Sequence, residues 1–320
     1  MELQTDQNTP VVVACDSSWQ SHEAVRTATR EASRRGVRLT ILVVVDRWTR
    51  RIERLGGIAQ MEEEARQSAQ VVAERAQWLA RHTDAWVSTQ LVLARDIEDP
   101  ALRVLGAQAA LLVVGAQGAG GQVAFSLGTT SAELARLFSC PLLVAGSTRP
   151  PSPDLGRSPA VVVGIGAEGP TEDLVAIAAH EASLRGVGVI VVHATRGPDT
   201  PGGPAPQAEL DRLWDAVSAV FREPRWADVP HRVVTSHEEP ADALVEHTEP
   251  GDLLVIGTRG GGRLAGLVTG SVCRAVLDAM PCDVLVVPPG HRPDVVAPQV
   301  PRQGSHDVGA GVPATQGNRG

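Results

Sequence analysis

Two glycine-rich stretches have the residue types and the spacing to bind the phosphate groups of a ligand. One runs from Val255 to Val272, reads VIGTRGGGRLAGLVTGSV, and lies between an apolar run and a segment with helical periodicity. Glycine has no Cβ, so its backbone N–H can approach an oxyanion closely, and it can also adopt positive φ. The N-terminus of the following helix adds free N–H donors and a favourable dipole. An anion-binding cradle is therefore predicted from Gly257, Gly260, Gly270 and Ser271.

The same pattern occurs a second time, in the first half of the chain. Residues 114–130 read VGAQGAGGQVAFSLGTT. The aligned positions, 115 with 257, 118 with 260, 128 with 270 and 129 with 271, are all 142 residues apart, and no gap is needed. A single glycine-rich loop is weak evidence because glycines also serve ordinary turns, but the duplicated spacing weakens that explanation considerably. A second cradle is predicted from Gly115, Gly118, Gly128 and Thr129.

The repeated pattern resembles the nucleotide-binding signature of the universal stress protein family, and the resemblance covers nearly all of residues 10–289 as two tandem copies. It implies two doubly wound, five-stranded parallel-sheet α/β domains of the Rossmann-like or flavodoxin-like kind, similar to the adenine nucleotide alpha hydrolases. It also implies binding of ATP, or of AMP or ADP, with Mg²⁺ accompanying the nucleotide, and a role in stress adaptation without turnover of a metabolite. The residues expected to bind the nucleotide are Asp16, Val44, Gly115, Gly118, Gly128, Thr129, Thr130, Gly257, Gly260, Gly270, Ser271 and Val272.

The two halves depart from the family pattern at different places. Asp16 follows the first strand, and the resemblance implies that a carboxylate at this position holds the adenosine end of the nucleotide. The aligned residue of the second half is Gly166, which has no carboxylate. The second half keeps the more typical phosphate loop, with Arg259 where the first half has Gln117. We expect one strong site in the first half and a weak or empty site in the second.

A competing motif lies at the start of the second half. Gly164, Gly166 and Gly169 spell G-x-G-x-x-G after a strand and before a helix, which is the dinucleotide fingerprint in its usual local setting. The fingerprint also requires an Asp or Glu for the ribose at the end of the next strand, and that strand ends in His193 and Ala194 instead. We therefore favour a degenerate stress-protein loop over an NAD site. His193 ends an apolar strand at the edge expected to face a ligand, but a structural or solvated role is the simpler interpretation.

Alternating apolar runs and helical patterns are predicted to position these loops. The segment EASRRGV at residues 31–37 recurs as EASLRGV at residues 181–187, so the repeat extends well beyond the glycines. Strands that alternate with helices are typical of βαβ units and a parallel sheet. In the first half we expect strands over residues 10–15, 39–45, 87–93, 111–114 and 142–145, and helices that include residues 58–81 and 101–108.

A chain of 320 residues has the length of two domains. The segments we expect are a tail over residues 1–9, a first domain over 10–147, a Pro-rich linker over 148–159, a second domain over 160–289 and a disordered tail over 290–320. The two domains are expected to pair within the chain through their last strands. A further homodimer and a protein partner of unknown identity are left open.

Composition excludes several classes of function. No apolar run is long enough to span a bilayer and the N-terminal residues lack a basic segment, so we expect a soluble cytoplasmic protein without a membrane partner. A net charge of −8 argues against nucleic-acid binding. All 29 basic residues are Arg, and a chain without Lys cannot form a Walker P-loop, a kinase-type lysine contact or a Schiff base.

Neither glycine loop carries a group suited to catalysis. No catalytic triad, paired carboxylates or activated nucleophile can be recognised, and the four cysteines lack the spacing of a metal site. Cys140 and Cys282 are equivalent in the repeat and are interpreted as buried core thiols. We expect a protein that is not an enzyme, with at most weak ATP hydrolysis. The alternatives are a nucleotide hydrolase or adenylyl transferase of related fold, and a protein-binding module with vestigial nucleotide sites.

Overall fold

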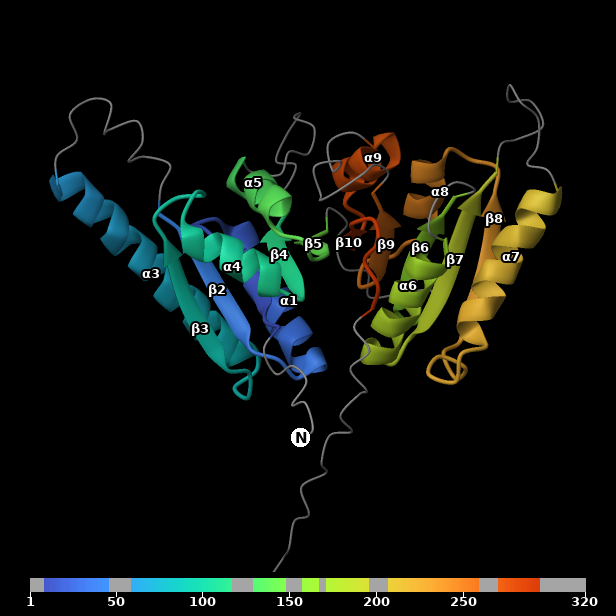
Figure 1. Ribbon diagram of the computed structural model, residues 1–320, viewed down its shortest axis with the longest axis horizontal. Coiled ribbons are helices and arrows are strands. Elements are labelled where there is room, and N and C mark those ends of the chain that lie inside the picture. The colour runs from blue at the N-terminus through green and yellow to red at the C-terminus, as the bar shows by residue number, and fades with distance from the viewer. Residues whose placement is uncertain are drawn as a thin grey trace, which may run out of the picture.

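The computed structural model describes residues 9–45, 59–116, 129–147, 157–166, 171–195, 207–258 and 270–293, and the structural statements below concern these residues. They form a ten-stranded sheet with helices on both faces (Figure 1). The first half comprises β1 (Val11–Cys15), α1 (Trp19–Arg35), β2 (Leu39–Val44), α3 (Ala59–Thr83), β3 (Thr89–Ala94), α4 (Pro100–Gln108), β4 (Leu111–Gly115), α5 (Thr129–Leu137) and β5 (Leu142–Ala145). The second half comprises β6 (Ala160–Ile165), α6 (Thr171–Arg185), β7 (Gly188–Ala194), α7 (Gln207–Phe221), β8 (His231–Ser236), α8 (Pro240–Glu246), β9 (Leu253–Gly257), α9 (Ser271–Ala279) and β10 (Asp283–Val287).

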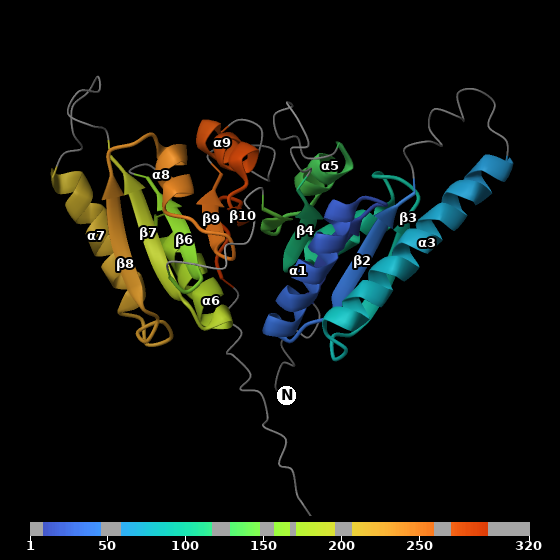
Figure 2. The ribbon, with the colours of Figure 1, turned by 180° about the vertical axis from the view of Figure 1, so that it is seen from behind.

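The strand order is β3-β2-β1-β4-β5-β10-β9-β6-β7-β8, so each half contributes five consecutive strands in the same doubly wound order. Neighbouring strands within each half are parallel. The two halves meet where β5 and β10 pair in antiparallel fashion, with Leu143 opposite Leu285. The expected pairing of the halves through their last strands is therefore present, and α3 and α7 lie at the two ends of the molecule (Figures 1 and 2).

Continuous apolar strands bury both faces of this sheet, as expected for parallel strands covered by helices. One core, to which Val11, Val13, Val161 and Val163 belong, lies under α1, α3, α6 and α7. The other core includes Val12 and Val162 and lies under α4, α5, α8 and α9. All four cysteines are buried as free thiols, which confirms the interpretation of Cys140 and Cys282.

Local signals in the sequence set the ends of the helices that follow the first strand of each half. The Ser18 side chain caps α1 by accepting a hydrogen bond from the backbone N–H of Ser21 at 3.2 Å. Gly36 ends α1 in the left-handed conformation, with φ of 65°, and Gly186 follows α6 with φ of 66°. Glycine adopts this conformation without the steric penalty of a Cβ, which explains why both helices end at the same place in the repeat.

A buried network of four charges joins α1 to α6 across the two halves. Glu31 and Arg35 of α1 are the repeat equivalents of Glu181 and Arg185 of α6. Each glutamate pairs with the equivalent arginine of its own helix and with that of the other helix, and Glu31 also pairs with Arg34. The distance between Arg35 Nη2 and Glu181 Oε1 is 2.5 Å, and that between Arg185 Nη2 and Glu31 Oε1 is 2.6 Å.

Charge compensation keeps this network ionised. Burial alone would raise the pKa of Glu181, but Arg35 and Arg185 outweigh that effect and lower this pKa to about 2. The pKa of Glu31 is lowered by the same two guanidinium groups, against the effect of its own burial. We call these four residues the interdomain network, and it fixes α1 against α6 by complementary charge.

Several expectations concern residues that the structure does not describe. Residues 148–156 of the Pro-rich segment and residues 294–320 of the C-terminal segment lie outside the described ranges, so the expected domain boundaries stay predictions. Among the helices that the structure describes, none has both the length and the apolar character needed to cross a membrane.

Candidate functional site

Each half contains one topological switch point, which is the usual ligand position in an open parallel α/β sheet. In the first half the chain passes from β1 outward to β2 and β3, and then returns to place β4 on the other side of β1. In the second half β6 and β9 occupy the equivalent positions. A ligand crevice is therefore expected beyond the carboxyl ends of β1 and β4 in one half, and beyond those of β6 and β9 in the other.

Asp16 lies at the first of these crevices, directly after β1. Its Oδ1 accepts hydrogen bonds from the backbone N–H and from the hydroxyl of Ser18, with a distance of 2.9 Å for the backbone contact. This turn holds the carboxylate at the start of α1, where Asp16 is exposed. Within the described residues Oδ2 accepts no hydrogen bond, so it can accept one from a ligand hydroxyl. Ser18 is not among the predicted site residues, although an Asp followed two residues later by Ser is the sequence signal for such a turn.

Gly115 and Gly257 end β4 and β9, and packing within the protein explains why both are glycine. A Cβ on Gly115 would lie 2.6 Å from the carbonyl oxygen of Gln20 at the start of α1. A Cβ on Gly257 would lie 2.9 Å from the Cδ1 atom of Leu174 in α6. These two residues line the predicted crevices, but their close contacts are with the helix that follows the first strand of each half.

Gly270 differs from those two glycines because nothing in the described chain requires it. Its φ of −84° is available to any residue, so the positive φ that glycine permits is not used here. A Cβ would have its nearest neighbour at 3.7 Å, the Cβ of Cys273, which is ordinary van der Waals contact. Among the described residues neither its φ nor a neighbouring atom requires a glycine, which leaves space for the close approach of a ligand.

The helix that starts at Gly270 also has uncapped donors. The N-cap residue of α9, Gly270, has no side chain with which to cap the helix, whereas Ser18 caps α1 and Asp99 caps α4. The first-turn N–H groups, which include those of Ser271 and Val272, have no acceptor within an α-helix, and they carry the positive end of the helix dipole. In Figure 1, α5 and α9 lie toward the same edge of the molecule on either side of the β5–β10 junction. An anion is the chemical group that this helix start can bind.

The other predicted site residues are placed only in part. Val44 ends β2 beside β1, and its half-buried side chain packs on the core under α4 and α5. Thr129 and Thr130 begin α5, and Val272, in the first turn of α9, is partly buried against the core under that helix. Gly118, Gly128 and Gly260, together with Gln117 and Arg259, lie outside the described residues.

The second crevice lacks the carboxylate of the first, because Gly166 follows β6 where Asp16 follows β1. The competing dinucleotide motif has a packing explanation. Gly164 lies within β6 and not in the turn after it, and a Cβ there would lie 3.0 Å from the side chain of Leu244 in α8. The first glycine of the fingerprint would be needed in the turn itself, so the structure favours the degenerate stress-protein loop.

The described residues near either crevice form no metal site of their own. In these parts of the chain, no three His, Cys, Asp or Glu side chains lie together in a way that could hold a metal ion.

Comparison with known proteins adds independent information. The model of the universal stress protein family matches residues 7–146 and 159–288. A universal stress protein of Mycobacterium tuberculosis is 31% identical over 286 residues, which is 86% of this chain and 96% of the relative. A second one from that organism is 30% identical over 288 residues, covering 86% and 95% of the two chains. The crystal structure of a universal stress protein from Archaeoglobus fulgidus covers 89% of this chain and 97% of its own, with a TM-score of 0.60 and 16% identity.

Proposed function

The chain belongs to the universal stress protein family, and we propose that it binds ATP together with Mg²⁺ and acts as a nucleotide-dependent regulator in stress adaptation. The observation that carries this proposal is Gly270 at the start of α9. Its φ of −84° and its open surroundings give the described part of the protein no need for a glycine there, and the helix that it starts is uncapped. A phosphate group fits both facts, because it needs close backbone approach and free N–H donors.

The adenosine end would bind at the first strand of each half. In the first half, Asp16 offers its second oxygen, Oδ2, to a ribose hydroxyl while Ser18 holds its Oδ1. A hydrogen bond to a charged group contributes about 1.5 to 3 kcal/mol, which corresponds to roughly ten-fold to a hundred-fold in affinity. Gly166 cannot make this bond. We therefore propose one strong site per chain, in the first half, and a weak site in the second.

The proposed role is regulatory because the described groups at the first crevice have structural partners: the Ser18 hydroxyl donates to Asp16 and also caps α1. Asp16 is engaged by Ser18, and its own neighbour Cys15 is buried, with burial and the charge of Asp16 raising the pKa of that thiol far above its usual range. The nucleotide would then act as a bound effector, and the readout of the switch would be a change in stability or in partner binding.

Isothermal titration calorimetry with ATP and Mg²⁺ tests the proposal. We expect one strong site in the wild type, its loss in Asp16→Ala, and its retention in Gly270→Val, which should lose only the weak second site. Asp84→Ala is the matched control, because Asp84 also accepts hydrogen bonds from a serine hydroxyl and a backbone N–H but lies between α3 and β3, away from both crevices.

Four results would contradict this assignment. Two sites of equal affinity, or one site that survives Asp16→Ala and disappears in Ser271→Ala, would show that the first half does not hold the single strong site. Absence of heat and of a thermal shift with ATP, ADP and AMP would remove nucleotide binding altogether. Release of phosphate at a rate well above that of the Gly270→Val and Asp16→Ala variants would identify an enzyme instead of a regulator.

A further inference from the structure

The outer strand of the first half, β3, ends the sheet with one side of its backbone open. Among the described residues β3 pairs with β2 alone. The carbonyl oxygens of Ser88 and Ala94 point toward β2, where each accepts a backbone hydrogen bond of 2.9 Å. Backbone groups alternate in direction along a strand, so the N–H and C=O groups of Thr89, Leu91 and Leu93 point to the open side.

Hydrogen bonds within the chain limit the open side to these three residues. The backbone N–H of Val87 donates to the carbonyl oxygen of Asp84 at 3.4 Å, before the strand begins. The N–H of Arg95 donates to the Asp99 carboxylate at 3.1 Å, just after the strand ends. The middle of the open set is therefore Leu91.

The sequence of β3 lacks the residues that usually protect an exposed sheet edge. It reads TQLVLA and contains neither a charged residue nor a proline, and these are the residues that commonly prevent such strands from pairing with other chains. The opposite edge strand, β8, begins with His231 and Arg232, both exposed, directly after Pro230. Although β3 and β8 are equivalent in the repeat, only β8 has this protection.

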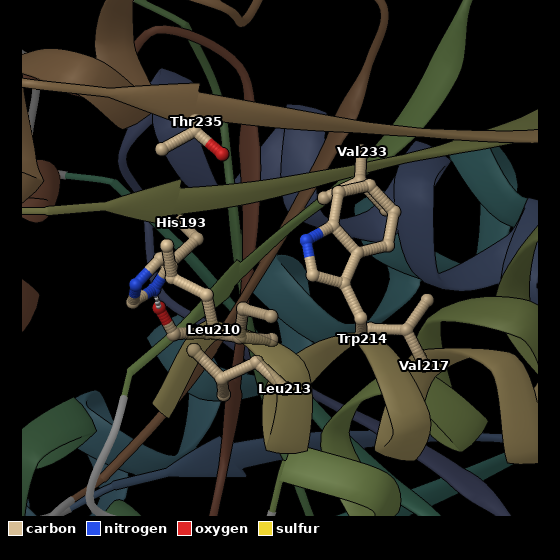
Figure 3. A pocket seen from close by; sticks show the side chains of 8 residues that line it. His193, Leu210, Leu213, Trp214, Val217, Val233 and Thr235 are labelled. Atoms are coloured by element: carbon tan, nitrogen blue, oxygen red, sulfur yellow. Dashed lines mark hydrogen bonds between the residues drawn. The ribbon is translucent and has the colours of Figure 1, made fainter. Parts of the chain in front are cut away.

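Exposed apolar side chains gather around the β3 edge. Seven large apolar side chains are exposed among the described residues. Five of them belong to α3, β3, α4 and the turn between α3 and β3, namely Val71, Trp78, Trp86, Leu93 and Val104. At the other edge, Trp214 of α7 lines a small recess together with Val233 of β8 (Figure 3), so these side chains face one another within the chain.

A second copy of β3 is complementary to this open backbone. In an antiparallel pair the outward groups of the two strands must face each other. A two-fold axis beside Leu91 places Leu91 opposite its own copy and Thr89 opposite Leu93 on both sides, so every outward N–H and C=O group of the open set finds a partner. No like charges meet, because the strand has none. The β5–β10 junction already joins two sheets in this antiparallel manner.

The helix beside this edge allows the position of the axis to be compared with α3. Gln77 of α3 donates to the Thr89 hydroxyl at 3.2 Å, so these two residues lie at the same level. Leu91 lies about 6.6 Å further along the strand. The helix joins two parallel strands and runs in the opposite direction, and this distance corresponds to about four of its residues. The axis beside Leu91 therefore lies level with residues 72 and 73.

The charges of α3 are complementary about that axis. An axis at residues 72 and 73 brings Glu63 of one copy to the level of Arg81 and His82 of the other. Glu63 and Arg81 are both exposed, and their separation equals about five turns of 3.6 residues, so they share one face of the helix. Gln77, whose side chain reaches β3, lies one turn before Arg81 on that face. A carboxylate thus lies beside a guanidinium at two symmetrical places, which favours association.

We propose that two copies of this chain form a dimer through β3, antiparallel about a two-fold axis beside Leu91, with Glu63 of each copy next to Arg81 of the other. The same surface is used on both copies, so the contact closes on itself and forms no filament. This interface goes beyond the proposed nucleotide function and does not depend on it, because β3 is not a strand of either switch point.

Sedimentation velocity of the full chain without nucleotide, over about 1 to 100 μM, tests the proposal. We expect a particle of twice the chain mass of 33.6 kDa. Leu93→Pro removes an outward N–H and places a ring in the interface but keeps the pairing with β2, so it should leave a monomer. Thr235→Pro is the matched control and should stay a dimer, because Thr235 is exposed and holds the equivalent outward position of β8.

Charge reversal on α3 tests the position of the axis without changing the sheet. Glu63→Arg and Arg81→Glu should each weaken dimerisation about ten-fold, because each replaces two symmetrical attractions by repulsions. The double variant should restore the wild-type affinity, since opposite charges face each other again. Arg75→Glu is the matched control and should change little. Arg75 lies on the flank of α3 that faces α1, where burial and then the Arg75 charge lower the pKa of His22.

Four outcomes would overturn the proposal. They are a monomer over the whole concentration range, a dimer that persists in Leu93→Pro, dissociation caused by Thr235→Pro, and a double charge variant that associates as weakly as the single ones. If circular dichroism shows that Leu93→Pro does not fold, the charge variants alone decide the result, because their side chains are on the surface of α3.

Discussion

At the scale of single residues, Asp283 makes the stability of the protein depend on pH. It begins β10 at the junction of the two halves, where its Oδ1 accepts a hydrogen bond of 2.9 Å from the backbone N–H of Gly146. Burial raises the pKa of this carboxyl to about 6, with the Glu31 charge acting in the same direction and the Gly146 hydrogen bond opposing both. A carboxylate with a raised pKa destabilises the folded state once it is ionised.

The sign of this effect determines a test. Between about pH 4 and pH 6 the folded protein holds a proton on Asp283 that the unfolded chain has lost, so the free energy of unfolding falls as pH rises through this window. Asp283→Asn keeps an oxygen acceptor for Gly146 and cannot ionise. We expect it to stabilise the protein at pH 7.5 by up to about 3 kcal/mol, with the upper limit reduced because part of the residue reaches solvent, and to change little at pH 4.

Urea unfolding at the two pH values measures the difference. The informative control is the wild type itself, whose stability should decline between pH 4 and pH 6 more steeply than that of Asp283→Asn. A variant that is destabilised equally at both pH values would show that the carboxylate contributes through its hydrogen bond alone.

At the scale of elements, the glycines at the carboxyl edge of the sheet fall into two classes. Gly115 allows the end of β4 to approach the start of α1, where a Cβ on this residue would meet the Gln20 carbonyl oxygen at 2.6 Å. Gly270 has no such neighbour among the described residues and starts α9. Described contacts explain the first class as part of the fold, whereas they give no structural reason for the second.

Alanine substitution separates the two classes. Gly115→Ala should cost about 1 to 3 kcal/mol of stability, because a backbone atom must move to admit the methyl group. Gly270→Ala should change stability by less than about 1 kcal/mol, since the reduced entropy of the unfolded chain offsets the poorer helix start. Chemical denaturation of both variants, with ATP calorimetry on each, provides the comparison. Equal losses of stability would mean that Gly270 also has a structural role.

The same contrast shows what the sequence can predict. Apolar runs and capping residues act within a few positions, so they predict β5 with its observed bounds and Gly36 as the end of α1. The predicted first strand begins at Pro10, but β1 and its pairing with β2 begin at Val11. The packing role of Gly115 depends on Gln20, which lies far away in the sequence, and no local pattern encodes that contact. The predicted contacts to a nucleotide stay predictions, since much of both glycine loops lies outside the described residues.

At the scale of the whole molecule, the interdomain network links the two halves by charge. The repeated EASRRGV and EASLRGV segments indicate equivalent residues, but not that the two copies meet. Arg35 and Glu181 have side chains that are 14% and 7% exposed, so removing one leaves a buried charge poorly compensated.

A double-mutant cycle on this pair tests the link. Arg35→Leu and Glu181→Leu should each cost about 3 to 5 kcal/mol, and the double variant should cost clearly less than the sum, because it leaves Glu31 paired with Arg185. Arg26→Leu with Glu23→Leu is the matched control, as that pair is well exposed and should couple by less than about 1 kcal/mol. Additive losses in the Arg35 and Glu181 cycle would show that the two charges do not interact.

The antiparallel junction of β5 and β10 gives a single chain the symmetry that two identical subunits would otherwise provide. In a homodimer every inherited substitution appears on both sides of the axis, so neither copy of a site can change alone. Here the gene encodes each side separately, and a substitution affects one half only. Two pairs of aligned positions in the repeat differ in this way: Asp16 corresponds to Gly166, and Val43 corresponds to His193. The tandem arrangement therefore allows each half to differ at its own site within a shared scaffold.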